Sequence, residues 1–228
     1  MKKYAIIVAG GSGKRMQTSV PKQFIVIKNK AVLMHTIEAF YNYDNDMEII
    51  VVIPENQFDY WEELCYNFNF DIRHTIIEGG EERFFSVKNA LEVIENEALV
   101  AVHDGVRPLI DRETIHRCFE AAEKNGAAIP VVPLKESIRK LDNMTSVAQN
   151  RNDFCNVQTP QVFRSEILIN AYNKNFSTNF TDDASVVEAN GHKIYTVNGA
   201  EQNIKLTTPY DLIFAEILLA KNINCCDV

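Results

Sequence analysis

No run of about 20 uninterrupted apolar residues, the length of a membrane-spanning helix, occurs in this chain of 228 residues. The first residues, Met1-Lys2-Lys3-Tyr4, lead directly into the strand-like segment Ala5-Ile6-Ile7-Val8, without the apolar stretch and cleavage site of a secretory leader. We therefore expect a cytoplasmic protein that does not enter a membrane.

The five cysteines form no C-x-x-C pair and have no histidine at the spacing of a zinc site. We expect reduced thiols at Cys65, Cys118, Cys155, Cys225 and Cys226. The adjacent pair Cys225-Cys226 could be a redox site, but its position near the end of the sequence is more typical of a frayed tail.

Basic residues are outnumbered, because 23 Lys and Arg stand against 31 Asp and Glu and give a net charge of −8. A surface that binds nucleic acid normally has the opposite balance, so no nucleic-acid partner is expected. Any binding of polyphosphate must then depend on a local cluster of cations.

Apolar residues make up 46% of the sequence and are grouped in runs of strand length, separated by segments with helical spacing. Such apolar strands are buried on both faces, which requires a mostly parallel, twisted sheet with helices on both sides. The length fits one α/β domain over residues 1–228. The expected strands are Ala5–Val8, Met47–Ile53, Thr75–Ile77, Leu99–His103 and Ala127–Val132, and the expected helices are Val32–Tyr41, Phe58–Phe68, Phe84–Asn96 and Arg112–Asn125, the last capped by Asp111.

The alternation stops after Pro133. Two segments, Glu136–Leu141 and Ser146–Gln149, carry polar residues at most positions and flank the turn-like Asp142-Asn143. A hairpin with so little apolar surface should project as an arm, over about residues 136–151, and needs another surface to rest on. A second subunit is the simplest such surface, so we expect a homodimer.

The pattern after the arm predicts two more helices and one strand, at Arg164–Asn173, Asp183–Asn190 and Lys193–Val197. A last helix is marked by its start, with Thr208 as the cap, Pro209 in the first position and Asp211 three residues after the cap, in the manner of a capping box.

The first strand leads into a glycine-rich turn, Ala9-Gly10-Gly11-Ser12-Gly13-Lys14-Arg15-Met16, which allows backbone N–H groups to approach an anion closely. A P-loop would require a glycine at Val8 and a serine or threonine at Arg15. A dinucleotide-binding fingerprint would require a third glycine at Met16. Neither pattern fits, which argues against a dinucleotide-dependent oxidoreductase.

Two cations follow this turn, Arg15 directly and Lys22 within Pro21-Lys22-Gln23 after a short polar loop. They should face whatever anion the turn holds, and a triphosphate fits best. A glycine turn after a strand is also a common tight connection, so this interpretation depends on Arg15 and Lys22 together.

Six segments, in the same order along the chain, resemble the sugar-phosphate nucleotidyltransferases and, among them, the methylerythritol phosphate cytidylyltransferases. They are the glycine turn with Pro21-Lys22-Gln23, Gly79-Gly80-Glu81-Glu82-Arg83 with Ser86-Val87, Val102-His103-Asp104-Gly105-Val106-Arg107-Pro108, Gln158-Thr159-Pro160-Gln161, Thr181-Asp182-Asp183-Ala184, and Asn203-Ile204-Lys205-Leu206-Thr207. The resemblance implies a Rossmann-like nucleotidyltransferase fold. It also implies transfer of the cytidylyl group of CTP to 2-C-methyl-D-erythritol 4-phosphate, with release of pyrophosphate, in the synthesis of isoprenoid precursors.

The ribitol 5-phosphate cytidylyltransferases share most of this pattern, but they usually have D-A-C where this chain has Asp183-Ala184-Ser185. Methylerythritol phosphate is therefore the favoured acceptor, ribitol 5-phosphate the alternative, and a CTP-binding sensor without turnover a distant one. Three segments depart from the usual pattern: Gly105-Val106 replace two alanines, Glu136-Ser137 replace Asp-Thr, and Asn150 replaces Asp. The serine weakens the case for a substrate contact by that hydroxyl.

The reaction would need no general base. The nucleophile is a phosphate monoester oxygen, already ionised near neutral pH, which attacks the α-phosphorus of CTP, so positioning and charge neutralisation suffice. Mg²⁺ or another divalent cation on the phosphate oxygens is implied. Asp104, at the end of a strand, is the expected carboxylate near it.

The resemblance assigns roles to individual residues. The catalytic cations would be Arg15, Lys22, Arg151 and Lys205. The nucleotide would contact Ala9, Gly10, Gly11, Gly13, Lys22, Gly79, Gly80, Ser86 and Asp104. The acceptor would be held by Asp104, Arg107, Thr159 and Lys205, together with Arg151 from the arm of the second subunit. His103 lies in an apolar strand and is expected to be a packed imidazole rather than a ligand or base.

Overall fold

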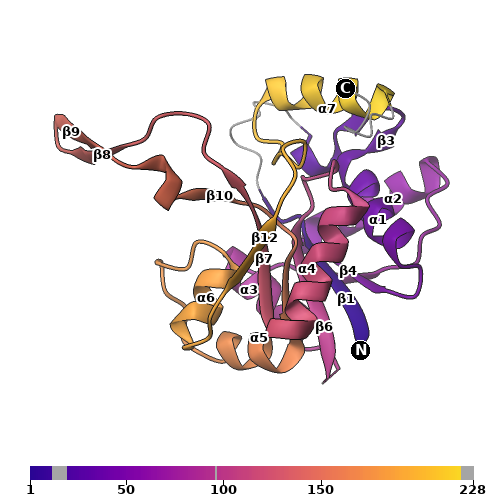
Figure 1. Cartoon of the computed structure of the whole chain (residues 1–228). Helices are drawn as coiled ribbons and strands as arrows, with labels where there is room; N and C mark the ends of the chain where they lie inside the picture. Colours follow the sequence, from indigo (N-terminus) through magenta and orange to yellow (C-terminus); the bar gives the residue numbers. More distant parts are fainter. Residues whose placement is uncertain (12–19, 96, 222–228) are drawn as a thin grey trace.

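The computed structural model describes residues 1–11, 20–95 and 97–221. Within them, eight strands form a central sheet: β1 (Lys2–Val8), β4 (Glu48–Ile53), β5 (Thr75–Glu78), β6 (Ala98–Asp104), β7 (Ala127–Pro133), β10 (Cys155–Val157), β11 (Gln161–Arg164) and β12 (Tyr195–Asn198). Their order is β10-β7-β11-β6-β1-β4-β5, and β12 pairs with β7 (Figure 1). The pairs β1–β4, β1–β6, β4–β5 and β7–β12 are parallel, whereas β10 and β11 run antiparallel to their neighbours. The expected mostly parallel sheet is confirmed.

Helices cover both faces of the sheet. On one face pack α1 (Val32–Tyr43), α2 (Phe58–Asn67) and α4 (Arg112–Asn125), and on the other α3 (Arg83–Leu91), α5 (Ser165–Tyr172) and α6 (Asp183–Ala189). Successive side chains of a strand point to opposite faces. In β1, Ala5 and Ile7 therefore join the first core, and Tyr4 and Ile6 join the second.

The helix ends follow the capping residues in the sequence. At the start of α4, the Asp111 carboxylate accepts from the Thr114 N–H at 2.6 Å, and α4 has the predicted bounds. At the start of α7 (Pro209–Lys221), the roles differ from the expected box. The Asp211 carboxylate accepts from the Thr208 N–H at 2.7 Å, and the Thr208 hydroxyl donates to the same carboxylate at 3.0 Å instead of accepting from the helix.

Some elements differ from the prediction. Helix α3 ends at Leu91 rather than near residue 96, which lies outside the described residues. The short strands β10 and β11 were not predicted, nor was the two-stranded pair β2 (Val26–Ile27) and β3 (Lys30–Ala31). These four strands have two to four residues each, and the sequence shows no periodic pattern over such short runs.

Between β1 and β6, the chain reverses the direction in which it adds strands to the sheet. After β1 the chain crosses to β4 on one side, whereas β6 lies on the other side and leads to β7. Val8 and Asp104 stand opposite each other at the carboxyl ends of the two strands. The strand ends are close, because a Cβ at Gly105 would lie 2.8 Å from the Cβ of Ala9. In open α/β sheets, ligands bind in the crevice at such a point.

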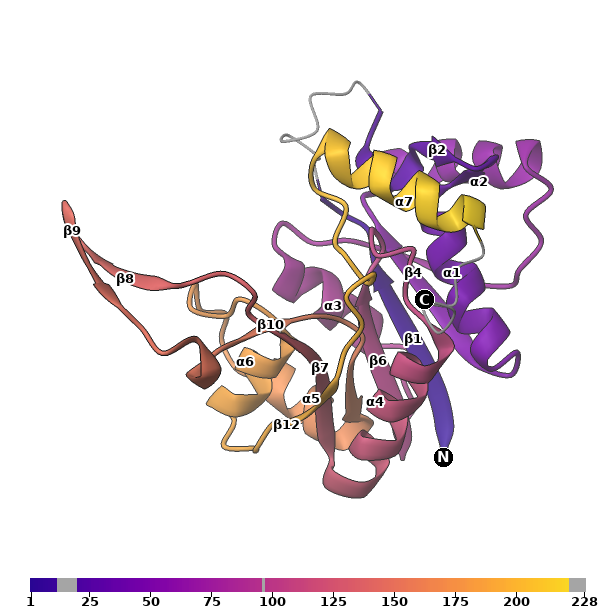
Figure 2. The ribbon, with the colours of Figure 1, turned by 45° about the horizontal axis from the view of Figure 1, so that its top comes forward.

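The hairpin formed by β8 (Arg139–Asp142) and β9 (Thr145–Ala148) projects from the rest of the molecule, as expected (Figures 1 and 2). Its apolar content is larger than expected, and this corrects the expectation of a nearly polar arm. Leu141, Met144 and Val147 are 78%, 102% and 61% exposed. These side chains could not pack in this chain because the hairpin extends away from the two cores.

No helix in the described ranges is both long and apolar enough to span a bilayer.

Candidate active site

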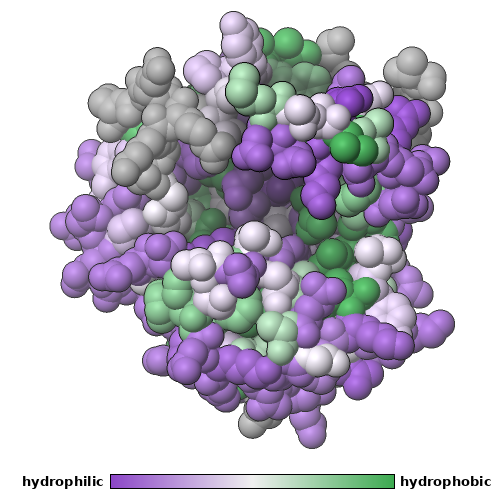
Figure 3. All heavy atoms as spheres, turned by 90° about the vertical axis from the view of Figure 1, so that its left-hand side faces the viewer, coloured by the Kyte–Doolittle hydropathy of each residue, from purple (hydrophilic) through white to green (hydrophobic). Residues whose placement is uncertain are grey.

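Two adjoining cavities lie at the carboxyl ends of β1 and β6, and Figure 3 shows a hollow on the side from which the arm projects. The larger, of about 420 Å³, is lined by Ala9, Gly10, Gly11, Lys22, Gly80 and Ser86, among others. The smaller, of about 290 Å³, is lined by Arg107, Gln158, Thr159, Gln161, Thr181 and Asp182. In the described part of the chain, the residues common to both are Arg83, Asp104 and Lys205. The two cavities therefore meet at these three charged side chains.

The backbone of two glycine segments forms the wall of the larger cavity. The Gly80 N–H donates to the Ser86 hydroxyl at 3.1 Å, which fixes the segment against the first turn of α3. The approach leaves no room for a side chain, because a Cβ at Gly80 would lie 2.3 Å from the Cβ of Phe85. Gly79 does not line the cavity but donates its N–H to the Ile53 carbonyl at 2.9 Å.

Lys22 brings a cation to the larger cavity from the short 3₁₀ helix η2 (Lys22–Phe24). Its Nζ donates to the carbonyl oxygen of Leu206 at 3.2 Å. This contact places the ammonium beside the segment that carries Lys205. Gly13 and Arg15, the other residues predicted from this turn, lie outside the described residues.

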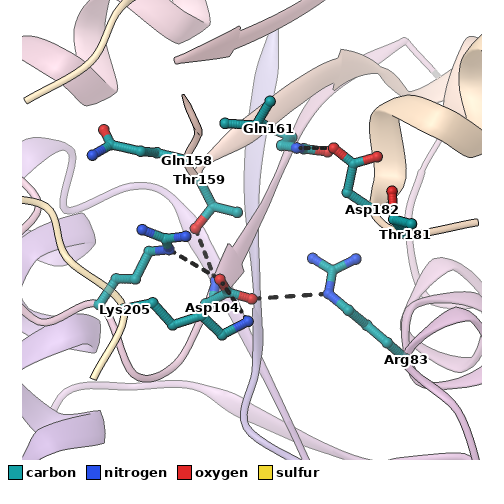
Figure 4. Close-up of a pocket in the computed structure, with 10 residues that line it drawn as sticks. Arg83, Asp104, Gln158, Thr159, Gln161, Thr181, Asp182 and Lys205 are labelled. Carbon is teal, nitrogen blue, oxygen red and sulfur yellow. Dashed lines mark hydrogen bonds and ion pairs between the residues drawn. The ribbon is translucent and has the colours of Figure 1, made fainter. Parts of the chain in front are cut away.

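Asp104 is surrounded by cations (Figure 4). Its Oδ2 accepts from Arg107 Nε at 3.0 Å and lies 3.2 Å from Lys205 Nζ, while its Oδ1 lies 3.9 Å from Arg83 Nε. Burial alone would raise the pKa of Asp104, but the charges of Arg83, Lys205 and Arg107 outweigh burial and hold the pKa well below its usual range. The carboxylate is therefore ionised at physiological pH.

A buried hydrogen-bond network holds residues of the smaller cavity together. Arg107 donates from Nη1 to the Asn203 carbonyl at 2.8 Å, and Asn203 Nδ2 donates to the Thr159 carbonyl at 2.8 Å. Asn203 is fully buried, and Arg107 is 9% exposed. The segment before Lys205 is thus held to the segment that contains Thr159. Lys205 and Thr159, both predicted to hold the acceptor, line the same cavity.

His103 is a packed imidazole, as expected. It is fully buried, and burial lowers its pKa to about 3. Its Nε2 lies 3.2 Å from the Arg107 carbonyl and must donate to it, so Nδ1 accepts from the Thr159 hydroxyl at 3.0 Å. The Thr159 hydroxyl in turn accepts from the Asp104 N–H at 3.1 Å. Its proton is already used within the protein.

Five polar residues that line the smaller cavity were given no role in the sequence analysis: Arg83, Gln158, Gln161, Thr181 and Asp182. All five belong to segments that resemble the family, so their presence in those segments was the available signal. Gln161 links two of these segments, because its Nε2 donates to the Asp182 carboxylate at 2.8 Å.

Arg151 is not brought to the cavities of its own chain. It lies in η4 (Arg151–Asp153) at the base of the arm, is exposed, and donates from Nη1 to the Lys135 carbonyl at 2.6 Å. It is absent from the described lining of both cavities.

The chain is similar to known proteins over nearly its whole length. The family model of 2-C-methyl-D-erythritol 4-phosphate cytidylyltransferase matches residues 4–221. Proteins of that name from Azobacteroides pseudotrichonymphae and Phocaeicola vulgatus are 53% and 51% identical; the alignments cover 95% and 96% of this chain and 98% and 100% of theirs.

Solved structures are also similar. The 4-diphosphocytidyl-2C-methyl-D-erythritol synthase of Anaerococcus prevotii superposes with a TM-score of 0.81 at 29% identity, covering 96% of each chain. The 2-C-methyl-D-erythritol 4-phosphate cytidylyltransferase of Thermus thermophilus gives 0.79 at 30% identity, covering 96% of this chain and all of the other. Sequence and structure agree over nearly the whole chain, which therefore belongs to the 2-C-methyl-D-erythritol 4-phosphate cytidylyltransferase family.

Proposed function

We propose that this protein transfers the cytidylyl group of CTP to 2-C-methyl-D-erythritol 4-phosphate and releases pyrophosphate. The observation that carries the proposal is the junction of two cavities at Arg83, Asp104 and Lys205. A transferase of this kind must bring two phosphate-bearing substrates together at one point, and cations there offset their repulsion. Family membership favours methylerythritol phosphate over ribitol 5-phosphate.

The cavities suggest a division of labour. The larger, with the backbone of Ala9, Gly10 and Gly11, suits a nucleotide, because N–H groups of a glycine turn bind phosphates. Gly80 and Ser86 add backbone and hydroxyl groups for the base. The smaller cavity has side-chain amide, hydroxyl and carboxyl groups from Gln158, Thr181 and Asp182, which suit the hydroxyls of a small polyol phosphate.

The chemistry assigned to the site needs no proton transfer by the protein. A phosphate oxygen of the acceptor attacks the α-phosphorus, and the bond to the bridging oxygen of pyrophosphate breaks. Lys22 and Arg15 compensate the charge of the leaving pyrophosphate, while Lys205 and Arg107 hold the acceptor. His103 is unsuited to act as a base because it is enclosed and hydrogen-bonded on both ring nitrogens.

A divalent cation, in our assignment Mg²⁺, fits this site only if the protein and the substrate bind it together. Within the described residues no group of three His, Cys, Asp or Glu side chains could hold a metal ion. Asp104 offers one carboxylate, whose Oδ1 is the less occupied oxygen. One carboxylate together with phosphate oxygens is a common way to bind Mg²⁺, and the ion would neutralise charge on the triphosphate.

The test of this function offers methylerythritol 4-phosphate and ribitol 5-phosphate in parallel, each with CTP or UTP and Mg²⁺, and measures pyrophosphate. We expect release with methylerythritol phosphate and CTP well ahead of the other pairs, since a site that pairs the cytosine amine leaves acceptors unsatisfied against uracil. Release with CTP alone, equal use of UTP, or preference for ribitol phosphate would each contradict the proposal.

The chain, in this proposal, is one nucleotidyltransferase domain of residues 1–228 that works as a homodimer with Arg151 acting in trans. Support comes from the arm, whose exposed Leu141, Met144 and Val147 need cover, and from the place of Arg151 away from the cavities of its own chain. Lys22 lines the cavity of its own chain and acts in cis. Neither nucleic acid nor a membrane is a partner, and action in the cytoplasm stays a prediction.

Mixing two inactive variants tests the shared site. Lys22→Ala and Arg151→Ala proteins, unfolded and refolded together, form a mixed dimer in which one site has both wild-type residues. About half of randomly paired dimers are mixed, with one good site of two, so roughly a quarter of wild-type activity should return. Folded mixed dimers that remain inactive would show that Arg151 does not reach across.

A further inference from the structure

Arg83 is the first residue of α3 and one of the three described residues that line both cavities. The other two, Asp104 and Lys205, were expected at the site from the sequence. Arg83 stands at the same junction, and Figure 4 shows it extending toward Asp104, with Lys205 close to the same carboxylate.

A buried carboxylate holds the guanidinium of Arg83. Nη1 and Nη2 each donate to one oxygen of Asp183 at 2.7 Å, which is the two-point geometry that fixes the plane of an arginine. Asp183 is fully buried at the start of α6, and the Tyr172 hydroxyl donates to its Oδ1 at 2.7 Å. The side chain of Arg83 can therefore not rotate without breaking this pair.

Three of the five N–H donors of Arg83 make no hydrogen bond within the residues that the structure describes. The Nε is 3.9 Å from Asp104 Oδ1, which is longer than a hydrogen bond. Asp183 is closed off from solvent, whereas the Arg83 side chain is 29% exposed. Arg83 lines both cavities, so an anion bound there can reach this side chain.

We propose that Arg83 is a further catalytic residue, whose remaining N–H donors bind phosphate oxygens at the junction of the cavities, and that Asp183 and Tyr172 position it. The inference rests on the proposed function. The acceptor oxygen and the α-phosphorus can meet only where the two cavities join, and a guanidinium can bind two phosphate oxygens at once.

The step itself is balanced without a proton from Arg83. A bond forms between the acceptor oxygen and the α-phosphorus, and the bond from that phosphorus to the bridging oxygen breaks. The electron pair of the broken bond leaves with pyrophosphate. Arg83 remains charged throughout. It offsets the negative charge on the oxygens of the α-phosphate in the transition state, when one bond is forming and the other is breaking.

A structural role is the competing explanation, because Arg83 also joins α3 to α6 through Asp183. The variants that separate the two are Arg83→Ala, Asp183→Asn and Tyr172→Phe, with Lys3→Ala as the matched control. Lys3 pairs with Asp44 at 2.8 Å, is also 29% exposed, and lies on β1 away from both cavities.

For each variant, pyrophosphate release is measured with CTP and methylerythritol 4-phosphate, and folding is checked by circular dichroism. We expect Arg83→Ala to lower kcat by about 10²-fold or more while KM for either substrate changes by less than about tenfold. Asp183→Asn should lower kcat less, because the charge remains but its orientation is lost, and Tyr172→Phe less again. Added guanidinium ion should restore part of the kcat of Arg83→Ala and none in the other variants.

The outcomes are distinct. A wild-type protein that releases no pyrophosphate refutes the proposed function itself. With an active wild type, two results would show that Arg83 has only a structural role. In the first, the Arg83→Ala protein folds and keeps a kcat within about twofold of that of Lys3→Ala. In the second, its kcat falls but guanidinium does not restore it. If Arg83→Ala does not fold, Arg83→Lys decides, because lysine keeps the charge but not the two-point geometry. A kcat equal to that of the wild type would then overturn the proposal, and a fall of at least about tenfold with unchanged KM would support it.

Discussion

Replacing Asp104 by asparagine removes the shared counter-charge of three cations while keeping the size of the side chain. In the protein, Arg107 Nε and Lys205 Nζ lie 3.0 and 3.2 Å from Oδ2, and Arg83 Nε lies 3.9 Å from Oδ1. Removing one partner of a buried ion pair costs about 3–5 kcal/mol, because the remaining charge is buried without compensation. Lys205 is 43% exposed and its share is screened by solvent, so the lower end of this range, about 3 kcal/mol, is expected.

Urea unfolding followed by circular dichroism measures this loss, without divalent cations. Because the pKa of Asp104 is depressed in the folded protein, its contribution is fully present above the unfolded value of about 3.9 and is lost as pH falls through the folded value. The difference between wild type and Asp104→Asn should therefore be constant near pH 7 and shrink progressively as the pH falls below about 5. The control Asp44→Asn, which removes the partly exposed partner of Lys3, should lose less than about 1 kcal/mol.

The same substitution should strengthen the binding of inorganic phosphate. With Asp104 neutral, the cations around it attract a free anion more strongly, and at an effective dielectric constant of 20 a unit charge at 4 Å is worth about 4 kcal/mol. Even a third of this amount gives about tenfold tighter binding. A stability loss equal to that of Asp44→Asn, or weaker phosphate binding, would refute the view that Asp104 is the internal counter-ion of the site.

Other substitutions probe Gly80 in the wall of the larger cavity, the buried imidazole of His103, and Lys22. Gly80→Ala should lose about 1–3 kcal/mol of stability and raise KM for CTP, because the new Cβ meets Phe85 at 2.3 Å. Gly10→Ala should keep its stability in the same urea titration, because among the described residues its new Cβ would meet only Pro54, at 4.0 Å. His103 should make the wild-type free energy of unfolding fall by up to about 1.4 kcal/mol per pH unit between pH 6.5 and about 3, because the unfolded state binds a proton there that the folded state does not. His103→Gln should remove this part of the fall, and an unchanged slope would contradict the burial argument. Lys22→Ala should lower kcat by about 10²-fold, and a change confined to KM for CTP would mean that Lys22 only binds.

The central layers of the fold follow from local sequence. The apolar runs predicted β1, β4, β6 and β7 because each is long enough to be read as a buried strand, and a shorter run, Thr75–Ile77, predicted β5. Asp111 fixed the start of α4. The arm was located by the loss of apolar spacing. Strands β10 and β11 were beyond such reasoning, because they exist only through antiparallel pairing with β7 and β6.

Cavity residues that lie in contiguous motifs were expected from the sequence, whereas a residue held by a distant partner was given no role. Lys22, Asp104, Arg107, Thr159 and Lys205 were expected together and line the two cavities. The pairing of Arg83 with Asp183, 100 residues away, has no local signature. The sequence of one subunit gives no local signal for what Arg151 contacts, because in the proposed dimer its substrate lies in the site of the other subunit.

The hydrogen bond from Lys22 to the Leu206 carbonyl spans 184 residues of sequence. Contacts of such separation are slow to form, because the entropy of closing the loop is lost before the contact exists. The sheet and its two cores, with the fully buried Trp61, can assemble before this contact does. Refolding should therefore pass through a compact chain whose tryptophan is already enclosed but whose cations are not yet gathered, and recovery of activity reports the arrival of residues 203–206 at the site.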